Sequence, residues 1–89
     1  MKITKQASAG TMESSDVYVE IEPKEKGLEI HIESVVEKQF GEKIEATVRD
    51  VLSDYNLTDA EVRIVDRGAL ECVIRARVET AIQRSGGGF

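Results

Sequence analysis

Apolar and polar side chains alternate strictly through the stretch Val17-Tyr18-Val19-Glu20-Ile21-Glu22. A period of two places alternate side chains on opposite faces, so it predicts a half-buried β-strand with the valines and the isoleucine inward. The stretch Leu28-Glu29-Ile30-His31-Ile32-Glu33 repeats this pattern. Between them lies Pro23-Lys24-Glu25-Lys26-Gly27, where proline fixes one dihedral angle and glycine permits a positive φ. We therefore predict that the two strands pair as a β-hairpin.

After Glu33 the pattern changes to that of an α-helix. Ser34 and Glu37 have the spacing of a capping box, in which each side chain satisfies a free backbone N–H at the helix start. Asn56 is a suitable carboxy-terminal cap. Between these ends, residues on one stripe recur every three or four positions and predict a buried face. They are Val36, Phe40, Ile44, Thr47, Val48, Val51, Leu52 and Tyr55.

The remaining sequence predicts one more strand and one more helix. Residues 61–67 alternate, with Val62 and Ile64 inward, and Gly68 then turns the chain into a helix over residues 69–84. The expected buried face of this helix consists of Leu70, Val73, Ile74, Val78, Ala81 and Ile82.

The predicted order is therefore strand, strand, helix, strand, helix, which indicates an α+β fold. A three-stranded sheet with one apolar face needs cover, and two amphipathic helices supply it on that face. With 89 residues the chain has room for one small core. We expect a single domain over residues 1–85, in which residues 1–16 are a mobile lead-in, and a flexible tail over residues 86–89.

The charge balance argues against a nucleic-acid partner. Seventeen acidic residues oppose 12 basic ones, for a net charge of −5, whereas nucleic-acid binding needs clustered Lys and Arg. An acidic surface suits docking on basic patches of other proteins. No apolar run approaches the ~20 residues needed to span a bilayer, and the amino terminus has no apolar signal-peptide region. A single cysteine forms no internal disulfide, so the cytoplasm is the expected location.

Small and polar residues precede the first predicted strand in the stretch Ala9-Gly10-Thr11-Met12-Glu13-Ser14-Ser15-Asp16. They have no helical or strand period, which predicts a mobile loop. Hydroxyl and carboxylate side chains at such a place often serve only to bond their own backbone in a turn. A serine between mobile and rigid chain is also accessible to a modifying enzyme. The loop composition leaves both interpretations open.

Several blocks of the sequence resemble the citrate lyase acyl carrier proteins, the gamma chains of that complex. The blocks are residues 9–17, Val36-Glu37-Lys38-Gln39-Phe40-Gly41, Asp66-Arg67-Gly68-Ala69-Leu70-Glu71-Cys72 and Arg75-Ala76-Arg77. The resemblance extends from Met1 to about Ser85. In that family the serine of a Glu-Ser-(Gly or Ser)-Asp block carries a prosthetic group. By position this residue is Ser14, with Ser15 in the variable slot.

The resemblance implies a 2'-(5''-phosphoribosyl)-3'-dephospho-CoA group attached to Ser14 through a phosphodiester. Its thiol would carry acetyl and citryl thioesters between the alpha (transferase) and beta (lyase) subunits of citrate lyase, which cleaves citrate to acetate and oxaloacetate. A prosthetic-group transferase and an acetylating ligase are the other implied partners. The chain itself would be a non-catalytic carrier subunit. Glu13 and Asp16 would keep the loop solvated or help to present it.

Two alternatives stay open. A malonate decarboxylase carrier bears a similar arm, although the blocks Gly68-Ala69-Leu70-Glu71-Cys72 and Val36-Glu37-Lys38-Gln39-Phe40-Gly41 favour citrate lyase. The chain could also be an unmodified α+β adaptor that holds other subunits together. The Asp-Ser-Leu triplet of the usual four-helix phosphopantetheine carriers is absent.

Other residues that bear reactive groups give weaker signals. His31 alternates outward between Glu29 and Glu33, where a hairpin offers no substrate pocket. One histidine and one cysteine, with forty residues between them, predict neither a metal site nor a catalytic set of side chains.

The second predicted helix carries two further groups of interest. Cys72 lies on a face of small residues with Ala69, Ala76 and Thr80, which is either a docking face for a larger subunit or a surface beneath the amino-terminal arm. Three arginines of this helix could bind the phosphates of an arm or acidic groups of a partner, or form surface ion pairs. They are Arg75, Arg77 and Arg84.

Overall fold

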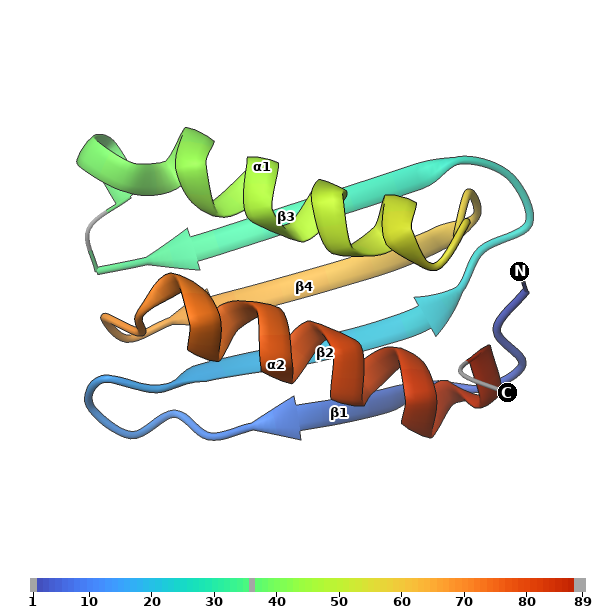
Figure 1. Cartoon of the computed structure of the whole chain (residues 1–89), viewed down its shortest axis with the longest axis horizontal. Coiled ribbons are helices and arrows are strands. Elements are labelled where there is room, and N and C mark those ends of the chain that lie inside the picture. The colour runs from blue at the N-terminus through green and yellow to red at the C-terminus, as the bar shows by residue number, and fades with distance from the viewer. Residues whose placement is uncertain (1, 36, 88–89) are drawn as a thin grey trace.

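The computed structural model describes residues 2–35 and 37–87, and for residues 37–40 and 87 the backbone alone. Within these residues a four-stranded sheet carries two helices on one face (Figure 1). The strands are β1 (Ala7–Gly10), β2 (Val17–Pro23), β3 (Leu28–Ser34) and β4 (Ala60–Asp66), and the helices are α1 (Glu37–Asp54) and α2 (Glu71–Ile82). A short π-helical turn, Gln83–Gly87, follows α2. The α+β class and the cover by two helices are thus as predicted, but the number of strands is not.

The strand order is β1-β2-β4-β3, so β4 lies between β2 and β3. It pairs antiparallel with β2 and parallel with β3, and α1 supplies the crossover that a parallel pair requires. The predicted hairpin of β2 with β3 is therefore wrong. Alternation indicates which face a side chain occupies but not which strand lies beside it. The turn at residues 24–27 is long enough to step across two strand spacings of about 4.8 Å each.

Hydrogen bonds hold this turn around the start of β4. The Ala60 N–H donates to the Gly27 carbonyl at 3.0 Å, and the Gly27 N–H donates to Asp59 Oδ1 at 2.7 Å. These two backbone groups of Gly27 thus bond to the start of β4 and not to a direct β2–β3 pair.

The strand β1 is the addition that the sequence did not predict. It pairs antiparallel with β2 and forms an edge of the sheet, with Ala9 buried against the core. Part of the expected lead-in over residues 1–16 is therefore ordered sheet. Both termini support this edge: the Thr4 N–H donates to the Ser85 carbonyl at 3.0 Å, and Arg84 Nη1 donates to the Ser8 carbonyl at 2.9 Å.

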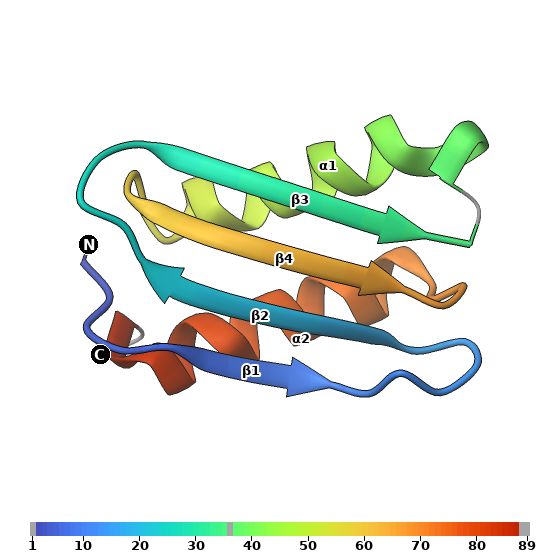
Figure 2. The same ribbon diagram turned by 180° about the vertical axis from the view of Figure 1, so that it is seen from behind.

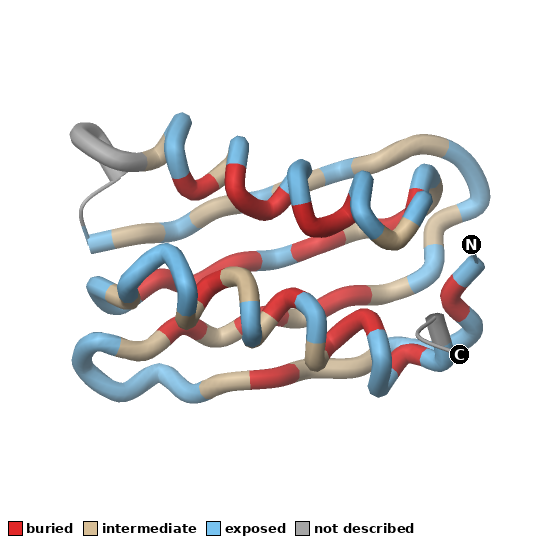
Figure 3. Tube along the Cα trace, in the orientation of Figure 1, coloured by how far each residue is buried: buried red, intermediate tan, exposed pale blue. Residues whose placement is uncertain are grey.

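One apolar layer between the sheet and the helices forms the core (Figure 3). The predicted inward residues of β2 and β4 are fully buried, and α1 and α2 contribute the matching stripes. Each such aliphatic side chain contributes about 1.5–3 kcal/mol when it leaves water, so this layer dominates the stability. The largest fully buried apolar side chains among the described residues are Val17, Val19, Ile21, Val48, Val51, Leu52, Val62, Ile64, Val78 and Ile82.

Two details of the predicted helices are wrong. Ser34 is the last residue of β3, and its hydroxyl donates to Asp66 Oδ2 at 2.8 Å, so it does not begin α1. Leu70 precedes α2 and is 71% exposed, although we expected it in the core. The side chains of Val36 and Phe40 lie outside the described residues.

In the described part of the chain, no helix covers the other face of the sheet (Figure 2). The outward residues of the strands lie there, including Tyr18, Glu20, His31 and Arg63. Neither helix, within the described residues, has the length and apolar character needed to cross a membrane.

Amide hydrogen exchange tests the central position of β4. A central strand bonds its backbone on both sides, so consecutive N–H groups of residues 61–65 should all be protected. In the edge strand β3 we expect protected and rapidly exchanging amides to alternate. Residue-resolved exchange by NMR measures this, and alternating protection in β4 would contradict the strand order.

Candidate functional site

Ser14 is exposed at the tip of the loop that joins β1 to β2. The Asp16 N–H donates to the Glu13 carbonyl at 3.1 Å, which closes a four-residue turn with Ser14 and Ser15 at its centre. Ser15 has a φ of 66°, and Ser14 is not among the residues with positive φ. A positive φ at the third position alone is the pattern of a type II turn, which favours glycine there. The slot that the resemblance allows to be Gly or Ser is thus the one that needs this backbone conformation.

The carboxylate of Asp16 holds the loop in place. It accepts hydrogen bonds from Thr11 Oγ1 and the Val17 N–H, both at 2.7 Å. Arg77 of α2 binds the same carboxylate as a fork, with Nε 3.2 Å from Oδ1 and Nη2 3.1 Å from Oδ2. Thr11 Oγ1 in turn accepts from the Glu13 N–H at 3.1 Å. One side chain therefore connects the serine loop to the start of β2 and to α2.

These contacts keep Asp16 ionised. Hydrogen bonds from Thr11 and from the Val17 backbone, helped by Arg77, lower the pKa of Asp16 from 3.8 to about 2. Partial removal from water acts in the opposite direction and is outweighed. At neutral pH the carboxylate is therefore ionised and accepts these hydrogen bonds, and its low pKa makes it a weak base.

A second carboxylate, Asp66 at the end of β4, organises the neighbouring loops. It is 2% exposed and accepts bonds from Ser34 Oγ at 2.8 Å, the Ala69 N–H at 2.9 Å and the Gly68 N–H at 3.2 Å. It thus joins the loop after β3 to the loop after β4.

The next residue, Arg67, extends the pairing of β2 with β4 into the serine loop. Its N–H donates to the Asp16 carbonyl at 2.9 Å, and its carbonyl accepts from the Ser15 N–H at 2.9 Å. The backbone of the loop is therefore hydrogen-bonded on both sides of Ser14, while the Ser14 side chain stays exposed.

The three arginines of interest all have partners. Arg77 binds Asp16 as described, Arg75 lies 2.8 Å from Asp50 and 3.5 Å from Asp54 of α1, and Arg84 donates to the backbone of β1. The ion-pair interpretation is confirmed for Arg75 and Arg77. Cys72 is exposed, so the alternative that placed it beneath the amino-terminal arm is wrong.

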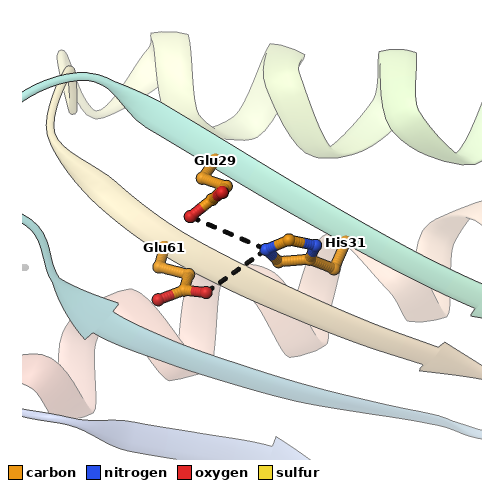
Figure 4. A group of neighbouring side chains, drawn as sticks. All are labelled: Glu29, His31 and Glu61. Carbon is orange, nitrogen blue, oxygen red and sulfur yellow. Dashed lines mark ion pairs between the residues drawn. The ribbon is translucent and has the colours of Figure 1, made fainter.

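A cluster on the open sheet face was not expected from the sequence. His31 Nε2 lies 3.2 Å from Glu61 Oε2 and 3.7 Å from Glu29 Oε2 (Figure 4). One ligand atom from each residue lies within 4.8 Å of the others, close enough to hold a cation in principle. Only the pairing of Glu29 with Glu61 across β3 and β4 brings them together. The His31 side chain is 50% exposed, so water competes for all three groups.

Comparison with known proteins identifies the family of this chain. Residues 4–85 match the family model described as Malonate decarboxylase delta subunit (MdcD). The chain is 58% identical over 85 residues to the citrate lyase acyl carrier protein of Haemophilus influenzae (strain PittEE), covering 96% of this chain and 88% of the relative. It is 48% identical over 85 residues to the protein of that name from Lactococcus lactis subsp. lactis (strain IL1403), with the same coverage. The chain belongs to the citrate lyase acyl carrier protein family.

The fold of this carrier family member is shared by a chain in the crystal structure of a Pseudomonas malonate decarboxylase hetero-tetramer in complex with malonate. The TM-score is 0.78 at 22% identity, covering 97% of this chain and 93% of that chain. At this identity the likeness shows the fold alone. The family predicted from the sequence blocks is confirmed.

Gly10, at the end of β1, provides a test of how tightly the serine loop is built. It has a φ of 89°, and a Cβ there would overlap the Val17 carbonyl oxygen, whereas Gly27 has a φ of 87° with open space around it. We expect Gly27→Ala to cost about 1–2 kcal/mol for its backbone conformation. Gly10→Ala should cost roughly 1 kcal/mol or more beyond the cost of Gly27→Ala, because the backbone must also move to make room for the new Cβ. Urea unfolding measures both, and equal losses would contradict this close approach.

The low pKa of Asp16 gives the loop a defined acid sensitivity. Because the folded pKa of about 2 lies below the unfolded value of 3.8, ionised Asp16 stabilises the loop fully above about pH 4. This contribution is lost as the pH falls from about 4 through 2. The NMR shifts of the Ser15 and Arg67 amides should follow it, and Asp16→Asn should abolish that titration. A midpoint near pH 4 in the wild type would contradict the described contacts.

Proposed function

We propose that this protein is the acyl carrier subunit of a citrate lyase and that Ser14 Oγ anchors its phosphoribosyl dephospho-CoA group. The observation that carries the proposal is an exposed Ser14 at the corner of a turn, within a chain of the citrate lyase acyl carrier family. A bulky group on this hydroxyl would displace no core side chain. The backbone on both sides of Ser14 is hydrogen-bonded, so the group would be attached at a fixed point.

Attachment is a phosphoryl transfer in which this chain supplies the nucleophile. Ser14 Oγ forms a bond to phosphorus of an activated phosphate donor, and the bond from that phosphorus to the donor's leaving group breaks. The hydroxyl proton must pass to a base. Asp16 is occupied by Thr11, Val17 and Arg77 and has a low pKa. We infer that the modifying transferase brings the base, and that this chain is not catalytic.

When bound, the group supplies a terminal thiol on a long arm that can carry acyl groups. A covalent arm replaces separate diffusional encounters with delivery at high effective concentration. Ser14 suits this role because the residues around it are held by Asp16 and Arg77, while its own side chain is exposed. The partners that follow are the transferase and lyase subunits of citrate lyase, the prosthetic-group transferase and the acetylating ligase. The single cysteine and the absence of an apolar segment in the sequence support a cytoplasmic location.

A malonate decarboxylase carrier is the second candidate. The description of the matching family model favours this candidate, whereas the 58% identity to a citrate lyase acyl carrier protein favours a citrate lyase carrier. Reconstitution distinguishes them: the modified chain should restore citrate cleavage to a citrate lyase that lacks its carrier, and should not restore malonate decarboxylation.

Replacement of each serine tests the attachment point. In a citrate-fermenting host, wild-type protein should exceed its sequence mass by the mass of the group. Ser14→Ala should have the bare sequence mass, and a lyase complex containing it should cleave citrate no faster than a complex without carrier. Intact-mass spectrometry and a citrate-cleavage assay measure both.

The matched control is Ser15→Gly. It removes the neighbouring hydroxyl while suiting the positive φ of that position, so stability should stay within about 1 kcal/mol of wild type. Mass gain and activity should both persist. An unmodified adaptor predicts full activity and no mass change in Ser14→Ala, and loss of the group only in Ser15→Gly would move the anchor to Ser15.

A further inference from the structure

The exposed large apolar side chains among the described residues all lie in loops at one end of the molecule, with Met12 beside the open face of the sheet and Leu70 beside the helices. They are Met12, 51% exposed, Val35, 65% exposed, and Leu70, 71% exposed. Met12 lies in the loop from β1 to β2, Val35 follows β3 and Leu70 precedes α2. These three loops lie at the same end of the sheet as Ser14, on the left in Figure 1 and on the right in Figure 2. These three apolar side chains therefore border the end of the molecule that carries Ser14.

Backbone hydrogen bonds hold the described residues of these loops in place. The Val35 N–H donates to the Asp66 carbonyl at 3.2 Å, and the adjacent Arg67 bonds through its backbone to Ser15 and Asp16. Leu70 stands at the start of α2, where its carbonyl accepts the first bonds of that helix. A surface that is already ordered loses little conformational entropy when a partner covers it.

The surface beside Leu70 is also concave. A cleft of about 360 Å³ lies there, and its lining includes Ile44, Ala69 and Ile74. An exposed leucine next to an apolar cleft can both insert into a partner and receive an apolar side chain from it, which is the usual form of a binding hot spot.

We propose that Met12, Val35 and Leu70 form a docking rim for the transferase that attaches the arm to Ser14. This inference rests on the proposed function. A transferase that forms a bond to Ser14 Oγ must bring the reacting phosphorus to within about 3–3.5 Å of it, so its surface has to cover this end of the chain. Subunits that act on the far end of a long arm have no such requirement. The partner should therefore present apolar residues around the mouth of its active site.

The initial rate of Ser14 modification tests the rim. Purified wild type and the double variant Val35→Asp/Leu70→Asp would be incubated in extract of a citrate-fermenting cell, with mass gain followed by intact-mass spectrometry. We expect the variant rate to fall roughly tenfold or more, because two apolar side chains would no longer be buried favourably. Both side chains are exposed, and circular dichroism checks that the fold is retained.

Two controls separate the rim from general charge effects. Ser53→Asp adds an acidic group at an exposed position near the end of α1, remote from the serine loop, and should be modified at the wild-type rate. Leu70→Met keeps an apolar side chain and should also be modified normally. Equal rates for wild type and the double variant would overturn the rim while leaving Ser14 as the anchor, and equal slowing by Ser53→Asp would also overturn it. No mass gain in the wild type would overturn the proposed function itself.

Discussion

The forked contact of Arg77 with the Asp16 carboxylate is the interaction on which the serine end depends. It joins residues 61 positions apart in sequence, one at the start of β2 and one on α2. Because α2 packs on β2 through the buried core, this contact fixes the position of the serine loop relative to that core. A charge-assisted fork fixes orientation as well as distance. Ser14 can therefore be exposed without the surrounding backbone being loose.

The sequence predicts which side of each helix and strand is buried better than it predicts which strands pair. The period of two in β2 and β4, and the helical stripes of α1 and α2, identify the buried residues because burial acts on each side chain separately. The strand order depends on which backbone groups meet, and alternation carries no information about this. β1 was missed for a related reason: its residues, Ala7–Gly10, are small, and its place in the sheet comes from backbone bonds to β2.

For the candidate site, too, the sequence predicts some features and not others. The loop composition and the family resemblance single out Ser14, and its exposure agrees with them. The role of Asp16 was not predictable, because its partner Arg77 could equally have faced a phosphate or another protein. The positive φ of Ser15 could not be predicted from the residue types of the loop either, since serine is common in turns of every type. The cluster of His31 with Glu29 and Glu61 likewise appears only once the β3–β4 register is known.

The strand order that alternation does not reveal is what assembles this end of the molecule. Since β4 pairs with β2, Arg67 continues that ladder into the serine loop, bonding to Ser15 and Asp16. Since β4 also pairs with β3, Asp66 bonds to Ser34 and to the backbone of Val35. If β2 and β3 paired directly, β4 could not lie between them. One of these two connections would then be lost. The central place of β4 is therefore a requirement of the site as well as of the core.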